Sequence, residues 1–365
     1  MRRLTEFDEL ADPSFSHAVV TWQQAHGRHA LPWQNTRDAY RIWLSEIMLQ
    51  QTQVAAVLGY YARFLERFPT LQDLAAASSE DVMAQWAGLG YYTRARNLHA
   101  CAQRVVAEYD GQFPSEPSLL AELPGIGRST AAAISAFSSG TRAAILDGNV
   151  KRVFARVFGI DQFPGEKKVE DALWRRADAL LPHDGIESYT QGLMDLGATL
   201  CTRARPDCAR CPLQTRCVAY ATGRTAELPV RKPKKTNPEK QAALLVLIDD
   251  GEVLLEQRAP SGIWGGLMSL PEVDGHLVRG AVDEAALSAA AARYGEVGEV
   301  QALLPLVHVF THYKLHIAPF KVVLAARGAL PEHHVWWKLA EIERAPLPAP
   351  VKKLLLEFAK PSLFS

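Results

Sequence analysis

Four of the five cysteines in the 365-residue chain lie within 17 residues of one another. Six, two and five residues separate them in turn, and Pro206 and Pro212 shape the loop. Thiolates at such close spacing favour a soft metal, and a set of four suits either zinc or an iron–sulfur cluster. Spacing alone leaves both possible, although zinc ribbons more often carry two Cys-x2-Cys pairs. The candidate ligands are Cys201, Cys208, Cys211 and Cys217.

A carboxylate suited to acid–base chemistry lies in the segment 38–52. Asp38 can cap a helix there, and Glu46 then shares one stripe with Ile42 and Leu49. Because apolar surroundings raise the pKa of a carboxyl group, Glu46 is a candidate general acid. The alternative is an exposed glutamate on an amphipathic helix, which is the commoner case for an isolated residue.

A glycine-rich turn follows at Leu123-Pro-Gly-Ile-Gly127. Pro124, Gly125 and Gly127 mark a tight turn, and small apolar residues predict a helix from near Arg128. Free N–H groups at such a helix start form a phosphate site, which needs no Walker lysine. The alternative is an ordinary connection between two helices, with Asp147 further on as a helix cap.

These candidate residues require a helical scaffold. Composition allows it, because 48% of the residues are hydrophobic and the length suits two or three domains. Apolar periodicity predicts helices at 14–28, 53–67, 79–87, 92–110, 166–180 and 187–200. The lone Cys101 on the fourth of these is expected to be a buried small hydrophobe.

Charge is distributed unevenly along the chain. The net charge is zero, so a DNA-binding surface must be local. Residues 231–240 carry five basic side chains and one acidic one, which indicates a basic linker. No apolar signal core or membrane-length stretch is present, so we expect a cytoplasmic protein.

The sequence texture changes at Gln241. Residues 241–257 predict strand, turn and strand, and residues 281–293 predict an Ala-rich helix. Two further strands are expected at 300–310 and 313–323, joined at Thr311-His312. This pattern predicts an α+β domain.

Three motifs carry a resemblance to one family. Glu46-Ile-Met-Leu-Gln-Gln-Thr52 resembles the catalytic helix of the MutY-type adenine glycosylases, and Leu123–Gly127 resembles the helix-hairpin-helix element of DNA glycosylases. The cysteine spacing is that of the endonuclease III and MutY families, where the metal is a [4Fe–4S] cluster. The motifs occur in the family's order over essentially the whole chain, which is identified as a MutY-type member.

The resemblance implies a mainly α helix-hairpin-helix catalytic region at 1–222, including the iron–sulfur loop. A linker at 223–240 and a C-terminal α+β Nudix-like domain at 241–365 would follow. It also implies that double-stranded DNA with adenine opposite 8-oxoguanine or guanine is the partner. We further expect a monomer that associates with the nucleoid when bound to DNA.

Roles for individual residues follow from the same resemblance. Glu46 would protonate adenine at N7, Asp147 would stabilise the oxocarbenium ion or attack it, and Asn149 would orient Asp147 or a water. The target adenine would be flipped out of the duplex. The residues expected at the DNA or the bases are Trp33, Leu49, Gln51, Tyr91, Gly125, Gly127, Ser129, Gln191, Phe310, Thr311 and His312.

Two departures from related patterns refine the expectation. Ser129 stands where endonuclease III enzymes carry the Schiff-base lysine, which favours a monofunctional glycosylase, although Lys151 near Asp147 offers residual lyase chemistry. Phe310-Thr311-His312 matches the Phe-Ser-His loop with which MutY reads 8-oxoguanine, with Thr in place of Ser.

The second domain is expected to recognise DNA and not to hydrolyse nucleotides. Ser261-Gly-Ile-Trp-Gly-Gly-Leu267 supports the Nudix likeness, but residues 280–295 lack the Arg-Glu-x-x-Glu-Glu that gathers magnesium. A nucleotide pyrophosphatase is therefore disfavoured. The remaining alternatives are a bifunctional pyrimidine glycosylase/lyase and a catalytically silent damage-binding module.

Overall fold

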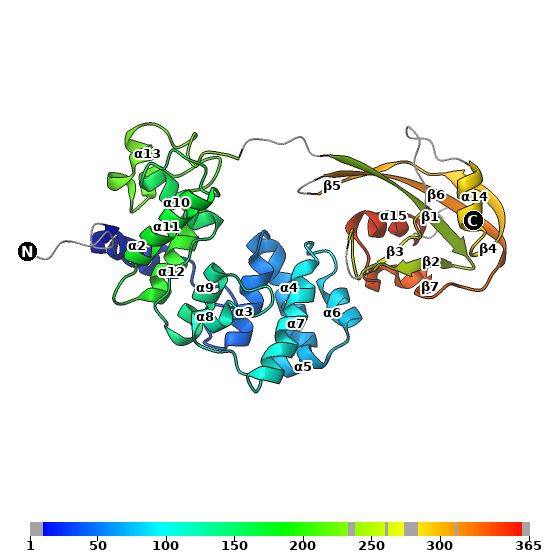
Figure 1. Ribbon diagram of the computed structural model, residues 1–365, viewed down its shortest axis with the longest axis horizontal. Coiled ribbons are helices and arrows are strands. Elements are labelled where there is room, and N and C mark those ends of the chain that lie inside the picture. Colours follow the sequence, from blue (N-terminus) through cyan, green and yellow to red (C-terminus); the bar gives the residue numbers. More distant parts are fainter. Residues whose placement is uncertain (1–9, 233–237, 260–261, 274–283, 311–312, 360–365) are drawn as a thin grey trace, which may run out of the picture. The chain divides into compact units, whose positions relative to one another are not determined.

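The computed structural model describes residues 10–232, 238–259, 262–273, 284–310 and 313–359 (Figure 1). Residue contacts divide the chain into two compact units. One comprises Met1–Ala76 and Asn97–Lys234, and the other comprises Ala77–Arg96 and Lys235–Ser365. Within the described residues, no helix is both long and apolar enough to cross a membrane.

The region before the linker is built from helices, most of them within two or three residues of the predicted bounds. Asp12 caps the first helix and Asp38 caps the second through side-chain bonds to backbone N–H groups. The helices are α2 (Pro13–His26), α3 (Ala39–Leu49), α4 (Val54–Arg67), α5 (Leu71–Ala76), α6 (Ser79–Trp86), α7 (Thr93–Glu108), α8 (Pro117–Leu120), α9 (Arg128–Ser139), α10 (Gly148–Val157), α11 (Lys167–Ala179), α12 (Ile186–Asp195) and α13 (Val218–Ala221).

The first unit has a continuous apolar core. Helix α12 packs against α2, α9 and α10, and α3 packs against α9. Phe15 of α2 and Phe154 of α10 meet edge to face in this core, with ring centroids 5.9 Å apart. Cys101 is buried, as predicted, and burial raises the pKa of its thiol to about 12.

The predicted single helix 187–200 is wrong in one respect. Helix α12 ends at Asp195 and continues as a π-helical turn, Leu196–Leu200. Gly197 in this turn lies so close to α10 that an added Cβ would be 2.5 Å from the Asn149 Cβ. Single π-helical turns often occur at functional sites, and this one brings the backbone of one helix against the start of another.

The second unit contains a mixed sheet. Its strands are β1 (Glu239–Asp249), β2 (Glu252–Gln257), β3 (Met268–Ser269), β4 (Gly295–Ala302), β5 (Leu306–Val309), β6 (Lys314–Arg327) and β7 (His334–Lys338). The order is β3-β2-β1-β6-β4, with β5 also paired to β6 and β7 to β2. Only β1 and β6 pair in parallel among the described strands.

Helices α14 (Glu284–Ala291) and α15 (Ala349–Ala359) complete this unit, with a 3-10 segment at Leu339–Arg344. Leu287 and Ala291 of α14 belong to the same buried apolar cluster as Leu245 and Leu247 of strand β1. A helix was predicted at 281–293. Helix α14 ends at Ala291, two residues earlier, and the first predicted residues, 281–283, lie outside the described part of the chain.

The predicted strand 300–310 is wrong, because it is two strands. Strand β4 ends at Ala302 and β5 begins at Leu306, with Pro305 between them. Proline lacks the N–H that a ladder requires, so pairing with β6 is interrupted there. Strand β7 was not predicted.

Candidate active site

Glu46 borders a cavity of about 540 Å³ in the first unit. Helix α3 places it one turn before its C-terminus, beside the buried Ile42 and Ile47. Burial, and secondly the negative charge of Asp147, raise the pKa of Glu46 to about 7. The carboxyl group can therefore carry a proton near neutral pH, as a general acid must. Other residues that line the cavity are Gln23, Arg28, Trp33, Gln34, Ser45, Phe137, Glu187 and Gln191.

Asp147 is the N-cap of α10. Its Oδ1 accepts a hydrogen bond from Val150 N at 2.8 Å, and its Oδ2 accepts one from Asn149 Nδ2 at 3.3 Å. Burial raises the pKa of Asp147, while these hydrogen bonds and the charge of Arg152 oppose part of the rise. The predicted pairing of Asp147 with Asn149 is therefore present.

The glycine-rich turn lies immediately before α9. Gly125 has φ +78°, and an added Cβ there would lie 2.9 Å from the Asn97 Cβ, so both backbone and space require glycine. At Gly127, the N-cap of α9, an added Cβ would meet nothing within 4 Å. The helix start is thus open to an approaching group.

Ser129 has a structural contact that the sequence did not reveal. Its Oγ accepts a hydrogen bond from Leu146 N at 3.0 Å and so ties α9 to the residue before Asp147. A lysine ammonium has no acceptor and cannot make this bond. The serine therefore helps to place the catalytic candidate Asp147.

The structure brings some predicted base contacts to the cavity and leaves others away from it. Trp33 and Gln191 line it, whereas Leu49 and Gln51 do not. Gln51 is exposed and has φ +57°, an uncommon conformation for a residue with a side chain. Tyr91, in the other unit, has φ +50° and is 49% exposed. Local strain of this kind often marks functional sites.

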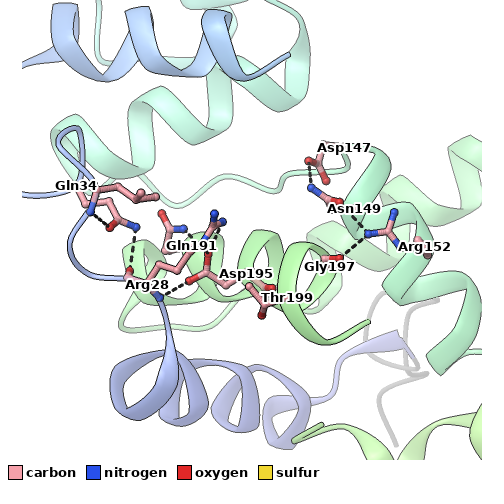
Figure 2. A network of polar contacts seen from close by, with 10 residues as sticks. Arg28, Gln34, Asp147, Asn149, Arg152, Gln191, Asp195, Gly197 and Thr199 are labelled. Atoms are coloured by element: carbon pink, nitrogen blue, oxygen red, sulfur yellow. Dashed lines mark hydrogen bonds and ion pairs between the residues drawn. The ribbon is translucent and has the colours of Figure 1, made fainter. Parts of the chain in front are cut away.

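A second polar network at the cavity centres on Asp195, at the end of α12 (Figure 2). Its carboxylate is fully buried and pairs with Arg28, whose Nη2 lies 2.7 Å from Oδ1. Gln191 Nε2 donates to the same oxygen at 2.8 Å, and Gln34 Nε2 donates to the Arg28 carbonyl at 2.9 Å. Sequence analysis missed Arg28 and Asp195, because only folding brings positions 167 residues apart together.

Arg152 of α10 lies beside Asn149 and Gly197 (Figure 2) and connects the surroundings of Asp147 to the cysteine loop. Its guanidinium donates to Asn149 Oδ1 at 2.9 Å, to the Gly197 carbonyl at 2.6 Å and to the Cys201 carbonyl at 2.8 Å. One turn later, the buried Arg156 donates to Cys201 Sγ at 3.3 Å. Two arginines at i and i+4 were the available signal for these contacts.

The four predicted cysteine ligands line one small cavity. Burial raises the pKa of Cys211 to about 11, and the charges of Cys201, Cys217 and Cys208 act in the same direction. As thiolates, the four cysteines would therefore repel one another without a cation among them. Within the described residues, no three His, Cys, Asp or Glu side chains converge closely enough to hold a single metal ion.

In the sheet unit, Phe310 belongs to an aromatic group at the end of β5. Its ring stacks on Tyr313 at 4.4 Å between centroids, and His308 meets it edge to face at 4.5 Å. The ring of Trp264, from the Nudix-like segment Ser-Gly-Ile-Trp-Gly-Gly-Leu, has its centroid 6.2 Å from that of Phe310. Thr311 and His312 lie outside the described residues.

Comparison with known proteins gives a family match for each of the two regions. Residues 44–178 match the HhH-GPD superfamily of base excision DNA repair proteins, and residues 242–357 match the NUDIX domain family. The chain also resembles a solved structure described as a thermostable thymine-DNA glycosylase. The two share 29% identity at a TM-score of 0.52, over 57% of this chain and 95% of that one. The predicted fold class, helix-hairpin-helix followed by a Nudix-like domain, is confirmed.

Full-length relatives narrow the assignment. An adenine DNA glycosylase of Buchnera aphidicola is 35% identical over 95% of this chain and 98% of that protein. The adenine DNA glycosylase of Homo sapiens is 32% identical over 95% of this chain and 74% of that protein. The predicted family is confirmed, and the chain belongs to the adenine DNA glycosylases of the helix-hairpin-helix base excision repair superfamily.

Proposed function

We propose that this protein is a monofunctional glycosylase that flips adenine out of duplex DNA and hydrolyses its N-glycosidic bond. The proposed substrates are adenine opposite 8-oxoguanine and adenine opposite guanine. One observation carries the proposal: Glu46 borders a cavity with its pKa raised to about 7 by burial and by the charge of Asp147, the N-cap of α10. Acid and anion are the two groups that glycosidic bond cleavage requires.

Glu46 is the general acid in this proposal. Its raised pKa supports donation of a proton to adenine N7, which makes the base a better leaving group. The cavity residues Trp33 and Phe137 offer apolar rings to a flipped base.

Asp147 stabilises the positive charge that develops on the sugar, or attacks it covalently. Asn149 and Val150 N hold the carboxylate in one orientation. Among the described residues, its direct partners are neutral N–H donors, and Arg152 acts on it only through its charge.

Ser129 supports the monofunctional reading, because a hydroxyl cannot form a Schiff base. Lys151 is an amine on the same helix as Asp147, but its Nζ pairs with Glu170 at 2.7 Å. That ion pair holds the amine against Glu170, which limits residual lyase chemistry.

The Nudix-like region is proposed to recognise 8-oxoguanine through Phe310, Thr311 and His312. We also propose that residues 1–222 form the catalytic region, that 223–240 link the two, and that 241–365 form the recognition domain. The DNA-contacting group would include Leu49, Gln51 and Tyr91, and the monomer would act on DNA in the cytoplasm.

Cys201, Cys208, Cys211 and Cys217 are proposed to hold a [4Fe–4S] cluster. Four cysteines line one cavity, and their thiolates would repel one another without a cation, so the set fits a cationic group. The cluster would hold the loop with Arg203, Arg205 and Arg210 in shape for a DNA phosphate. Iron and sulfide analysis of purified protein, with Cys208→Ser as the depleted variant, tests this assignment.

The central experiment measures base release in single turnover. Duplexes would carry adenine opposite 8-oxoguanine, guanine or thymine, with and without alkali. We expect release opposite 8-oxoguanine and guanine, and strand scission only after alkali. Scission without alkali, or borohydride trapping as efficient as a true lyase, would overturn the monofunctional assignment. Binding without base release would identify a silent damage-binding module instead.

A further inference from the structure

The loop between α6 and α7, in the second unit, presents an aromatic ring to solvent in a strained conformation. Its backbone is left-handed at Gly88, Gly90 and Tyr91, with φ of +96°, +77° and +50°. Glycine adopts such angles freely, but a residue with a bulky side chain holds them only where its surroundings impose them. Because Tyr91 is 49% exposed, the groups that impose its angle must lie on the buried side of the loop.

Arg94 lies on that buried side. It is the second residue of α7 and is only 9% exposed. Its Nη2 donates to the Gly90 carbonyl at 3.2 Å, and Nε1 of the buried Trp86 donates to the same oxygen at 3.1 Å. On the other side of Tyr91, the Tyr91 carbonyl accepts from Arg94 N at 2.9 Å. Since a peptide unit is planar, these bonds hold both peptide planes that flank Tyr91 and so fix its φ.

The same guanidinium acts on the ring of Tyr91. Its carbon lies 5.6 Å from the centroid of that ring and 5.2 Å from the ring centroid of Trp86, both within the range of cation–π attraction. Burial lowers the pKa of Arg94 to about 10, so the group still carries its charge at neutral pH. Both the backbone and the ring of Tyr91 are therefore held by one residue.

We infer that Arg94 is a positioning residue, which fixes this loop so that the Tyr91 ring is presented to DNA as a preformed stacking surface. The inference rests on the proposed function and names the residue on which one of its proposed base contacts depends. Every nucleobase has a face on which an aromatic ring can stack. A ring that is already fixed loses less conformational freedom on binding, so more of the stacking free energy remains as affinity.

The test is a double-mutant cycle between Arg94→Met and Tyr91→Ala. Methionine keeps an apolar stem but removes the charge and the side-chain donors. Two signals would be measured on duplexes with adenine opposite 8-oxoguanine: single-turnover base release, and the fluorescence of 2-aminopurine placed beside the 8-oxoguanine, which brightens when its stack is opened. Each single variant should slow base release about tenfold and remove most of the fluorescence rise. The double variant should be no slower than Tyr91→Ala alone, because Arg94 acts through that ring.

Two further variants separate positioning from general damage. Trp86→Phe keeps a buried ring but removes the second donor to the loop carbonyl, so it should slow base release about threefold, and only when Tyr91 is present. This variant tests the inference even if Arg94→Met folds poorly. Arg63→Met is the matched control, because the exposed Arg63 lies 4.6 Å from the ring centroid of Tyr60 within the regular helix α4. It should behave as wild type.

Additive losses in the double variant, or a fluorescence rise in Arg94→Met equal to that of wild type, would overturn the inference. Both results leave adenine release by wild type, and so the proposed function, standing. Absence of adenine release by wild type would instead defeat the proposed function. In that case a fluorescence rise that depends on Arg94 only through Tyr91 would still uphold the inference for a DNA-binding protein, and absence of any rise with wild type would overturn it.

Discussion

Two aspartates near Glu46, the half-buried Asp147 and the fully buried Asp195, are held in different ways (Figure 2). Asp147 stands at the start of α10, where backbone and amide N–H groups are its direct partners. Asp195 stands at the end of α12, where a full guanidinium charge and a second side chain bind it. One carboxylate is held by dipoles and the other by a cation.

The difference separates a reacting group from a supporting one. Dipoles orient Asp147 without neutralising it, and burial raises its pKa, so its charge gains most when a cation forms beside it. Asp195 is already paired with the Arg28 guanidinium, so its carboxylate serves to fix Arg28 and Gln191 in place. The number of buried carboxylates does not identify a catalytic residue, but the kind of partner does.

The largest effect should follow removal of the charge at Asp147. Asp147→Asn should lower the single-turnover rate of base release on the order of 10³-fold, because no anion then faces the oxocarbenium ion. The melting temperature of this variant should be unchanged or slightly higher, because the substitution removes a charge whose burial is incompletely compensated. A marked loss of stability would show that Asp147 is a supporting residue like Asp195.

Removing the other carboxylate should act on the fold. Asp195→Ala leaves Arg28 without its buried partner and should cost about 3 kcal/mol of unfolding free energy. Chemical denaturation with an unchanged m-value measures this directly. An Asp195→Ala protein as stable as Asp147→Asn would remove the distinction between the two sites.

Glu46 sharpens the comparison through pH. The acid must be protonated, so the wild-type rate should fall as pH rises through about 7, and Glu46→Gln should be slower by about 10²-fold with no such fall.

Because the folded-state pKa of Glu46 is raised, the stability due to its protonated form is present below about pH 4.5 and lost as pH rises through about 7. Glu46→Gln should flatten that part of the stability profile. Retained mismatch binding in Glu46→Gln is the control for folding.

Arg152 should give the smallest of these effects. Arg152→Met removes the donors to Asn149 and to the Gly197 and Cys201 carbonyls, so Asn149 is less firmly held beside Asp147. We expect about a tenfold slower base release, as for other residues that orient a functional ligand. Unchanged rates would show that Asn149 positions Asp147 without help from the cysteine loop.

Local signals were sufficient for most helices and for the chemical candidates. Caps such as Asp38, the turn glycines before α9 and the cysteine spacing act over a few residues, so they can be read in order along the chain. Prediction failed at 300–310, where Pro305 interrupts the ladder, and at β7, a strand of five residues with little pattern of its own.

The amino-acid sequence by itself determined the family, the order of helical and sheet regions, and the identities of Glu46, Asp147 and the four cysteines. Only the tertiary structure decided that Arg28 meets Asp195, that Ser129 holds Leu146, and that Arg152 joins Asn149 to the Cys201 carbonyl. These contacts span many residues, and their side chains are common at exposed positions. Their roles arise from burial and from the direction of hydrogen bonds, which exist only once the chain is folded.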